Sequence, residues 1–135
     1  SGSSQGFDPV VVEPGEIAWG YVYFGDLTGD GLTFELTTNG EEPNTYFLPV
    51  EVTEFNVTGD QIVGVITNNL TVGVSGPIQV SGVCLSADGV LLDSISAYAE
   101  QNELAPGASG SFSIDFYGDT LCQVGLLAGS GYGEL

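Results

Sequence analysis

The stretch GDLTGDGLTFE at positions 25–35 places oxygen-bearing side chains in a spacing that suits a hard cation. Asp26, Thr28 and Asp30 occupy alternating positions and Gly31 follows them, as in the first half of a calcium-binding loop. Calcium is bound by carboxylate, hydroxyl, carbonyl and water oxygens, which this stretch can supply. Calcium is therefore the one cofactor that the sequence suggests.

The second half of that calcium loop is incomplete. A loop of the helix-loop-helix type ends on a bidentate acid, whereas the chain has Thr37 at that position, and no helix is predicted after it. Two interpretations stay open. A looser site could be completed by a distant acid such as Glu41 or Glu42, or the stretch is a Gly- and Asp-rich turn between two strands.

The composition excludes most catalytic chemistry. The chain has 18 Asp and Glu residues but no Lys, Arg or His, and its formal net charge is −18. No Ser-His-Asp triad, lysine Schiff base, arginine finger or ordinary zinc site can form from these residues. Paired carboxylates, as in glycosidases, occur by chance among so many acids. We therefore expect no enzymatic activity and no catalytic residue.

The same charge restricts the partners of the chain. Without basic side chains it has nothing to neutralise phosphate, so binding to nucleic acid or to an anionic membrane surface is not expected. The carboxylates repel one another in the compact state, which salt and divalent cations should relieve. A saline habitat, escape from cleavage after Lys or Arg, and a chosen composition each account for this bias.

Two cysteines, Cys84 in VSGVCLS and Cys122 in TLCQVGLL, lie in strand-like runs. In an exported β-protein such a pair usually forms a disulfide. The bridge would close a loop of a length that contributes about 4 kcal/mol in the chain-entropy model. The alternative is two buried free thiols.

The organisation of the chain predicts one domain. Its 135 residues match the usual size of a single domain. The start, SGSSQG, predicts a small flexible tail over residues 1–7, of the kind left by signal removal, a lipoprotein tether or cloning, and residues 8–135 form the domain. No run of about 18 apolar residues is present, so no direct membrane insertion is predicted.

Alternating apolar residues predict an all-β fold. Phe112, Ile114 and Phe116 point one way in GSFSIDFYG, and Gly, Pro, Asn or Asp separates most of the strand-like runs. Strands at this spacing favour an antiparallel β-sandwich of about nine strands. We expect them over residues 8–13, 16–25, 31–38, 45–55, 60–68, 76–86, 89–98, 109–117 and 121–128.

From residue 58 to about residue 130 the chain resembles the FxLYD-type domain of bacterial surface proteins and lipoproteins. The resemblance rests on IVGVITNN, IQVSGVCLSADGVLL and LAPGASGSF in this order. The name-giving Phe-x-Leu-Tyr-Asp is replaced by GVCLSADG, with Cys84 at the aromatic position. The resemblance implies an Ig-like sandwich exported to the cell surface and carries no catalytic motif. Residues 8–57 look like the extra sheet that precedes this domain in actinobacterial surface lipoproteins.

Glycans enter the predictions in two ways. Asn56-Val57-Thr58 and Asn69-Leu70-Thr71 match the pattern for N-glycosylation at Asn56 and Asn69. Aromatic side chains cluster in the first half of the chain, where they could form a sugar-binding platform or simply pack in the core. These aromatic residues are Trp19, Tyr21, Tyr23, Phe24, Tyr46 and Phe47.

The N-terminal run FDPVVVEPGE suggests assembly. Val10, Val11 and Val12 form an apolar segment that could close the edge of its own sheet or add to the edge of a neighbouring copy. The expected function is therefore a structural or adhesive role at the cell surface or outside the cell. The alternatives are a pilus-like homopolymer with residues 8–13 as donor strand, and a calcium- or glycan-binding module.

Overall fold

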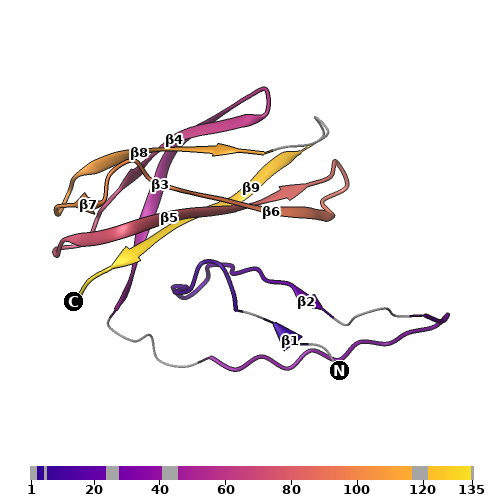
Figure 1. Ribbon diagram of the computed structural model, residues 1–135. Coiled ribbons are helices and arrows are strands. Elements are labelled where there is room, and N and C mark those ends of the chain that lie inside the picture. The colour runs from indigo at the N-terminus through magenta and orange to yellow at the C-terminus, as the bar shows by residue number, and fades with distance from the viewer. Residues whose placement is uncertain (1–2, 5, 24–27, 41–45, 117–121, 135) are drawn as a thin grey trace.

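Residues 47–132 form an antiparallel sheet of seven strands that curls over on itself (Figure 1). The computed structural model describes residues 3–4, 6–23, 28–40, 46–116 and 122–134. Over these residues the prediction of an all-β chain is confirmed: they contain no helix, and so none that is long and apolar enough to cross a membrane. The strands are β1 (Ser3–Ser4), β2 (Val22–Tyr23), β3 (Phe47–Thr58), β4 (Gln61–Thr67), β5 (Val74–Leu85), β6 (Leu91–Tyr98), β7 (Glu103–Leu104), β8 (Ser109–Asp115) and β9 (Gln123–Tyr132).

Strand β3 belongs to both halves of the curled sheet. The strand order is β6-β5-β9-β3-β4-β8, and β7 pairs with β5. Residues 47–50 of β3 pair with residues 129–132 of β9, whereas residues 51–58 pair with residues 61–67 of β4. The register of β3 against β4 shifts between Val52 and Glu54. Such a bulge bends a strand, and here it lies where β3 leaves β9.

One side of the curl is closed by main-chain contacts between its two ends. Ala99, which directly follows β6, forms an antiparallel bridge with Phe112 of β8. Beside it, the N–H of Glu100 donates to the carbonyl of Ser111 at 3.0 Å. The last strand in the sheet order therefore returns to the end of the first.

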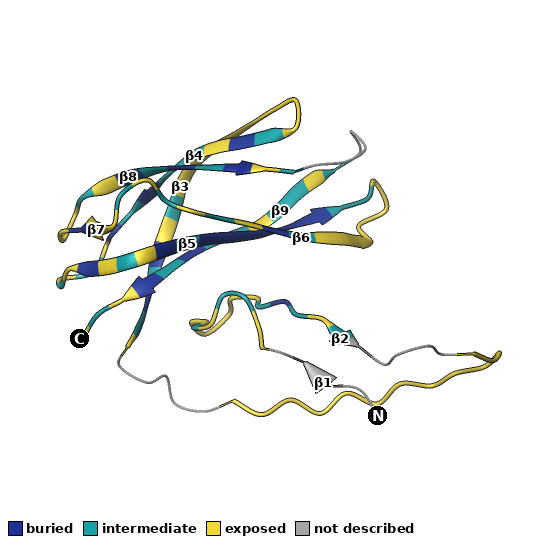
Figure 2. Cartoon of the chain, viewed as in Figure 1, coloured by how far each residue is buried: buried dark blue, intermediate teal, exposed yellow. Residues whose placement is uncertain are grey.

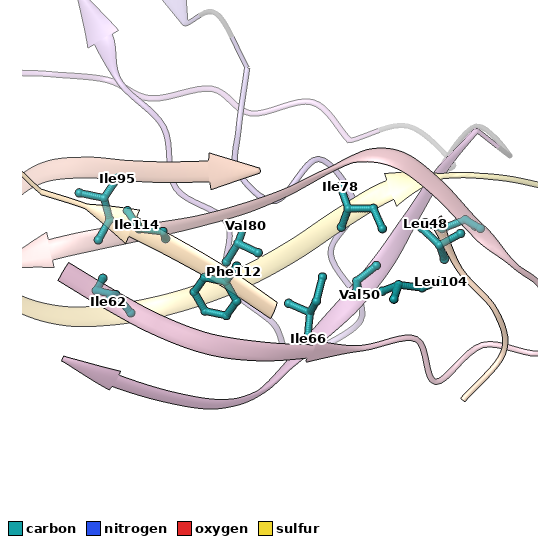
Figure 3. Close-up of a cluster of buried hydrophobic side chains, with 11 residues drawn as sticks. Leu48, Val50, Ile62, Ile66, Ile78, Val80, Ile95, Leu104, Phe112 and Ile114 are labelled. Atoms are coloured by element: carbon teal, nitrogen blue, oxygen red, sulfur yellow. The ribbon is translucent and has the colours of Figure 1, made fainter. Parts of the chain in front are cut away.

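The apolar core fills the space that the curl encloses (Figure 3). Side chains alternate between the two faces of a strand, and this alternation determines which of them reach the core. In β8, Phe112 and Ile114 point inward, while Ser113 between them does not. Burial is concentrated on the seven-stranded sheet, and residues 6–40 are mostly exposed (Figure 2). The core consists of Leu48, Val50, Ile62, Ile66, Val74, Ile78, Val80, Ile95, Leu104, Phe112 and Ile114.

Gly64 of β4 is required by a close contact with Phe112. A Cβ at this position would lie 2.5 Å from Cζ of the Phe112 ring and 2.5 Å from the main-chain oxygen of Glu54. We expect Gly64→Ala to lower the free energy of unfolding by about 1–3 kcal/mol, because the ring or the strand must shift. Denaturant unfolding measures the change. Gly73→Ala is the control, since its nearest neighbour is the carbonyl oxygen of Leu104 at 3.9 Å; equal losses in both variants would contradict the assignment.

The predicted strands in the later part of the chain are confirmed. Each of the expected runs 45–55, 60–68, 76–86, 89–98, 109–117 and 121–128 corresponds to one strand of the sheet, namely β3, β4, β5, β6, β8 and β9. The ends differ by a few residues, as strand boundaries usually do. Glycine, proline and aspartate residues at the turns were therefore good indicators of where the strands end.

The N-terminal third differs from the prediction. Within residues 8–13 and 16–25, the described part contains only β2 and an isolated bridge between Asp8 and Trp19, and residues 31–38 belong to no strand. The strands predicted over residues 8–13 and 31–38 are therefore wrong, and the one predicted over residues 16–25 is confirmed only at Val22–Tyr23. An alternating sequence forms a strand only where it can pair in a ladder with another strand, and alternation alone does not show where such an edge lies. In the predicted tail, β1 pairs with β2.

Candidate functional site

An open seam lies on the side of the sheet opposite the Ala99–Phe112 bridge. We define the open seam as residues 51–58 of β3 and residues 123–128 of β9. In the part of the chain that the structure describes, residues 51–58 pair only with β4 and residues 123–128 only with β5. β3 and β9 are neighbours in the sheet order, yet their ladder ends at Val50 and Gly129. Each strand therefore has one edge without a ladder along the seam.

The seam exposes side chains that belong to the inner face. Val57 pairs with Ile62, Phe55 pairs with Gly64, and Ile62 pairs with Ile114. Directly paired residues project from the same face of a sheet, so Phe55 and Val57 project from the face that carries the core. Both are nevertheless 46% exposed, because none of the described strands covers this flank of β3. The seam is thus an apolar edge open to solvent.

The N-terminal loop, residues 8–19, covers the point where β3 and β9 separate. Two main-chain hydrogen bonds of 2.8 Å between Asp8 and Trp19 close this loop. A groove of about 380 Å³ lies between it and strands β3 and β9, and a second of about 310 Å³ lies between it and β9. Pro9, Glu16 and Leu127 line both grooves. The loop is therefore packed beside the seam without adding a strand to it.

Carboxylates line the larger groove. Glu13 and Glu16 come from the N-terminal loop, where the Glu13 N–H donates to Oε2 of Glu16 at 3.0 Å. Glu51 comes from β3 and accepts a hydrogen bond from the Asn69 side-chain amide. The groove mouth is therefore negatively charged, which disfavours acidic ligands.

The aromatic residues of the N-terminal third fall into two environments. Trp19 is only 8% exposed, so its ring is not presented as a flat platform for a sugar. Its indole N–H has no acceptor among the described atoms. Tyr21 is half exposed, and partial burial together with the nearby charge of Asp93 raises the pKa of its hydroxyl. This interaction places Tyr21 near β6.

Residues 28–40 carry exposed apolar side chains at alternate positions. Leu32 is 48% exposed, Phe34 64% and Leu36 73%, and the residues between them are Thr33 and Glu35. This part of the chain lies along the side of the molecule away from the β3–β4 hairpin (Figure 1). A strand-like sequence with one apolar side is thus presented to solvent.

The calcium interpretation gains no partner acid in the described structure. Thr28 and Asp30 are exposed, and Gly31 has a φ of 74°, which suits a turn. Asp26 and the predicted completing acids Glu41 and Glu42 lie outside the described residues. No group of three or more acids or other metal-ligating side chains occurs within the described ranges.

The remaining predicted residues are separated in space. Cys84 and Cys122 form the predicted disulfide, with Cα atoms 5.0 Å apart, and it ties β5 to the residue before β9. Asn56 and Asn69 are exposed, as glycosylation would require. Val10 and Val12 are exposed in the N-terminal loop, where the structure forms no strand.

The sequence reasoning did not identify the open seam. It predicts that the strand ends at residue 55, whereas β3 continues to Thr58. The alternation of Phe55 and Val57 before the Gly59-Asp60 turn was the available signal. The alternation of apolar residues shows which face of a strand is buried. It does not show which of the two edges of the strand is paired.

Comparisons with known proteins give no assignment. No protein-family model matches the chain, and no curated protein and no solved structure matches it. Function is therefore inferred from the residues and their arrangement.

Proposed function

We propose that the chain is an exported, non-catalytic protein with a structural or adhesive role at the cell surface or in the extracellular space. The Cys84–Cys122 disulfide supports an oxidising compartment. The lack of Lys, Arg and His supports a role without catalysis, because the usual bases and nucleophile activators are missing. In this proposal the curled sheet is an Ig-like sandwich of the FxLYD type, in which β3 passes from one layer to the other.

The observation that carries the proposal is the apolar surface of the N-terminal third. Trp19 is its one buried apolar side chain among the described residues. Apolar surface of this extent in a soluble domain marks an interaction site. The exposed large side chains are Phe7, Val10, Val12, Ile17, Tyr21, Leu32, Phe34 and Leu36.

Self-association into a homopolymer is the form of this role that the surface favours. The same chain presents an open apolar seam and exposed apolar side chains in its N-terminal third, and a second copy could cover them. Mutual repulsion between copies that each carry a net charge of −18 opposes their association. Salt or calcium would screen that repulsion.

Sedimentation velocity at two salt concentrations tests the proposal. At about 1 M NaCl, where the Debye length falls to about 3 Å, we expect species larger than the monomer whose fraction rises with protein concentration. At about 0.01 M NaCl we expect the monomer to dominate. Calcium and magnesium at equal ionic strength separate screening from specific calcium binding. A monomer at every concentration and in every salt would contradict self-association.

A further inference from the structure

We propose that two copies of the chain pair edge to edge along the open seam, with residues 54–58 of β3 in one copy antiparallel to the same residues of the other. This inference rests on the self-association proposed above and names the surface and the register of the contact. A two-fold axis at Asn56 relates the two copies, so the contact is closed and joins copies in pairs. A longer homopolymer needs a second contact elsewhere on the chain.

The β3 edge of the seam carries main-chain groups that no described strand uses. Thr58 and Gln61 close a two-residue hairpin, so the N–H and C=O groups of Phe55 and Val57 point away from β4. Residues 53–58 are all exposed and contain no proline or lysine, which commonly protect an edge. The pairing with β4 is regular over residues 54–58. This stretch is therefore a regular strand with one edge that can accept another strand.

The β9 edge of the seam is protected by a bulge. Two steps along β5, from Ser81 to Val83, match three steps along residues 125–128 of β9. Within this bulge Leu126 has a φ of 52°, in the left-handed region that few residues other than glycine adopt. A bulge interrupts the ladder and twists an edge away from further pairing. An added strand therefore pairs with β3 rather than with β9.

The β3 edge is complementary to itself in one register. When the two Asn56 residues lie opposite each other, Phe55 of each copy lies opposite Val57 of the other. The main-chain groups of Phe55 and Val57 point outward, so these residues form the hydrogen-bonded pairs that an antiparallel ladder requires. Their side chains are each 46% exposed on the inner face, so the pairing also covers apolar surface.

Electrostatic repulsion favours the same register. The paired stretch contains one acid, Glu54, which lies opposite Thr58 of the other copy when the axis is at position 56. An axis at Val57 would place Glu54 opposite Asp60, and an axis at Glu54 would place two glutamates opposite each other. Like charges directly opposite each other destabilise a pair of strands. The register centred on Asn56 avoids both contacts.

The bulge in β3 disfavours the remaining nearby register. A two-fold axis at Phe55 would pair Val57 of each copy with Thr53 of the other. Thr53 is the extra residue of the bulge in β3, and a bulged residue leaves the regular ladder. With the axis at position 56, only the regular residues 54–58 pair with one another.

A second copy suits this edge better than the N-terminal loop of the same copy. The groove beneath that loop is lined by residues 49–52 of β3 and ends before residue 53. Five paired residues make a smaller contact than a standard interface of about 800 Å² per partner. We therefore expect weak pairing that strengthens with protein concentration and with salt.

Matched lysine substitutions in the full chain test the seam. Val57→Lys places a charge on the covered face and should lower the association constant at about 1 M NaCl by at least about tenfold. Because lysine reduces the net negative charge, general repulsion alone would give tighter association instead. Val90→Lys makes the same change at a 60% exposed side chain between β5 and β6, and should alter the constant by less than about threefold. Circular dichroism checks that each variant keeps its β-structure.

Cysteine cross-linking tests the register independently of the lysine variants. With the axis at position 56, Asn56→Cys brings the two Cα atoms to about 4.5 Å, a distance that a disulfide can span. Oxidised glutathione should then link this variant into covalent dimers in high salt, as seen on a non-reducing gel. Thr58→Cys is the control, because its two copies lie more than about 13 Å apart in this register.

The outcomes separate the seam from self-association in general. If the chain associates but Val57→Lys and Val90→Lys associate equally well, or if Thr58→Cys cross-links as readily as Asn56→Cys, the edge pairing is overturned while self-association stands. If the unmodified chain stays monomeric in every salt, the proposed function itself fails.

Discussion

Replacing Asn68 with alanine should lower the free energy of unfolding by about 3 kcal/mol, because three buried or half-buried main-chain groups lose their partners. Asn68 is fully buried between β4 and β5. Its side-chain amide donates to the carbonyls of Val72 and Leu104, both at 2.9 Å, and its side-chain oxygen accepts from the Leu70 N–H at 3.0 Å. These bonds hold the β4–β5 connection against β7, so their removal should lower the stability of the fold.

Asn69 provides a matched control in the next position. It is exposed, and its amide bonds only to the surface carboxylate of Glu51 among the described residues. Asn69→Ala should change the free energy of unfolding by less than about 0.5 kcal/mol. Urea unfolding at equal protein concentration measures both variants. Equal losses at the two positions would show that the Asn68 bonds do not stabilise the fold as described.

Removing the Cys84–Cys122 disulfide should have the other large effect on stability. The bridge joins residues 38 apart in the sequence, and in the chain-entropy model a loop of that length stabilises the fold by about 4 kcal/mol. The double variant Cys84→Ala/Cys122→Ala should lose about this much in denaturant unfolding. Domains of this size have total stabilities of about 5–15 kcal/mol, so the loss is a large share.

Reduction of the unmodified chain separates the bond from the side chains. Cys84 is buried, so alanine at this position also removes some packing. The reduced wild-type chain keeps both sulfur atoms and should lose most of the same stability. A loss below about 1 kcal/mol on reduction would mean that the unfolded chain is already constrained in another way, and would contradict the entropy argument.

The sheet was predictable where local pattern and pairing agree. In β8, Phe112 and Ile114 alternate with serine, and the structure buries this alternating face. At the start of β4, Gly59-Asp60 sets the turn and the pairing of Thr58 with Gln61. Short hairpins convert such local signals directly into register, which explains why these strands match the prediction closely.

The N-terminal third was not predictable in the same way. The run IAWGYVYF is apolar on both faces, which indicates a central strand. In its described part only Val22 and Tyr23 belong to a strand, paired with β1, and Trp19 forms an isolated bridge with Asp8. A strand needs a free edge at the right place, and edges are set by tertiary structure. The open seam was missed for the same reason.

The acidic composition restricts how copies of the chain can associate. Each copy carries 18 acids and no base, so no side-chain salt bridge can join one copy to the next. Association must then depend on apolar contacts, main-chain hydrogen bonds and screening ions. The exposed side chains of Phe55 and Val57 in the open seam meet that condition.

Hydrogen exchange of the monomer and of the high-salt polymer, compared residue by residue, tests the central claim most directly. Main-chain amides exchange slowly when they are hydrogen-bonded in stable structure. We predict that the seam amides of Phe55 and Val57, which point away from β4, exchange fast in the monomer and become protected in the polymer. Unchanged exchange at Phe55 and Val57 on assembly would contradict a role of the open seam in self-association.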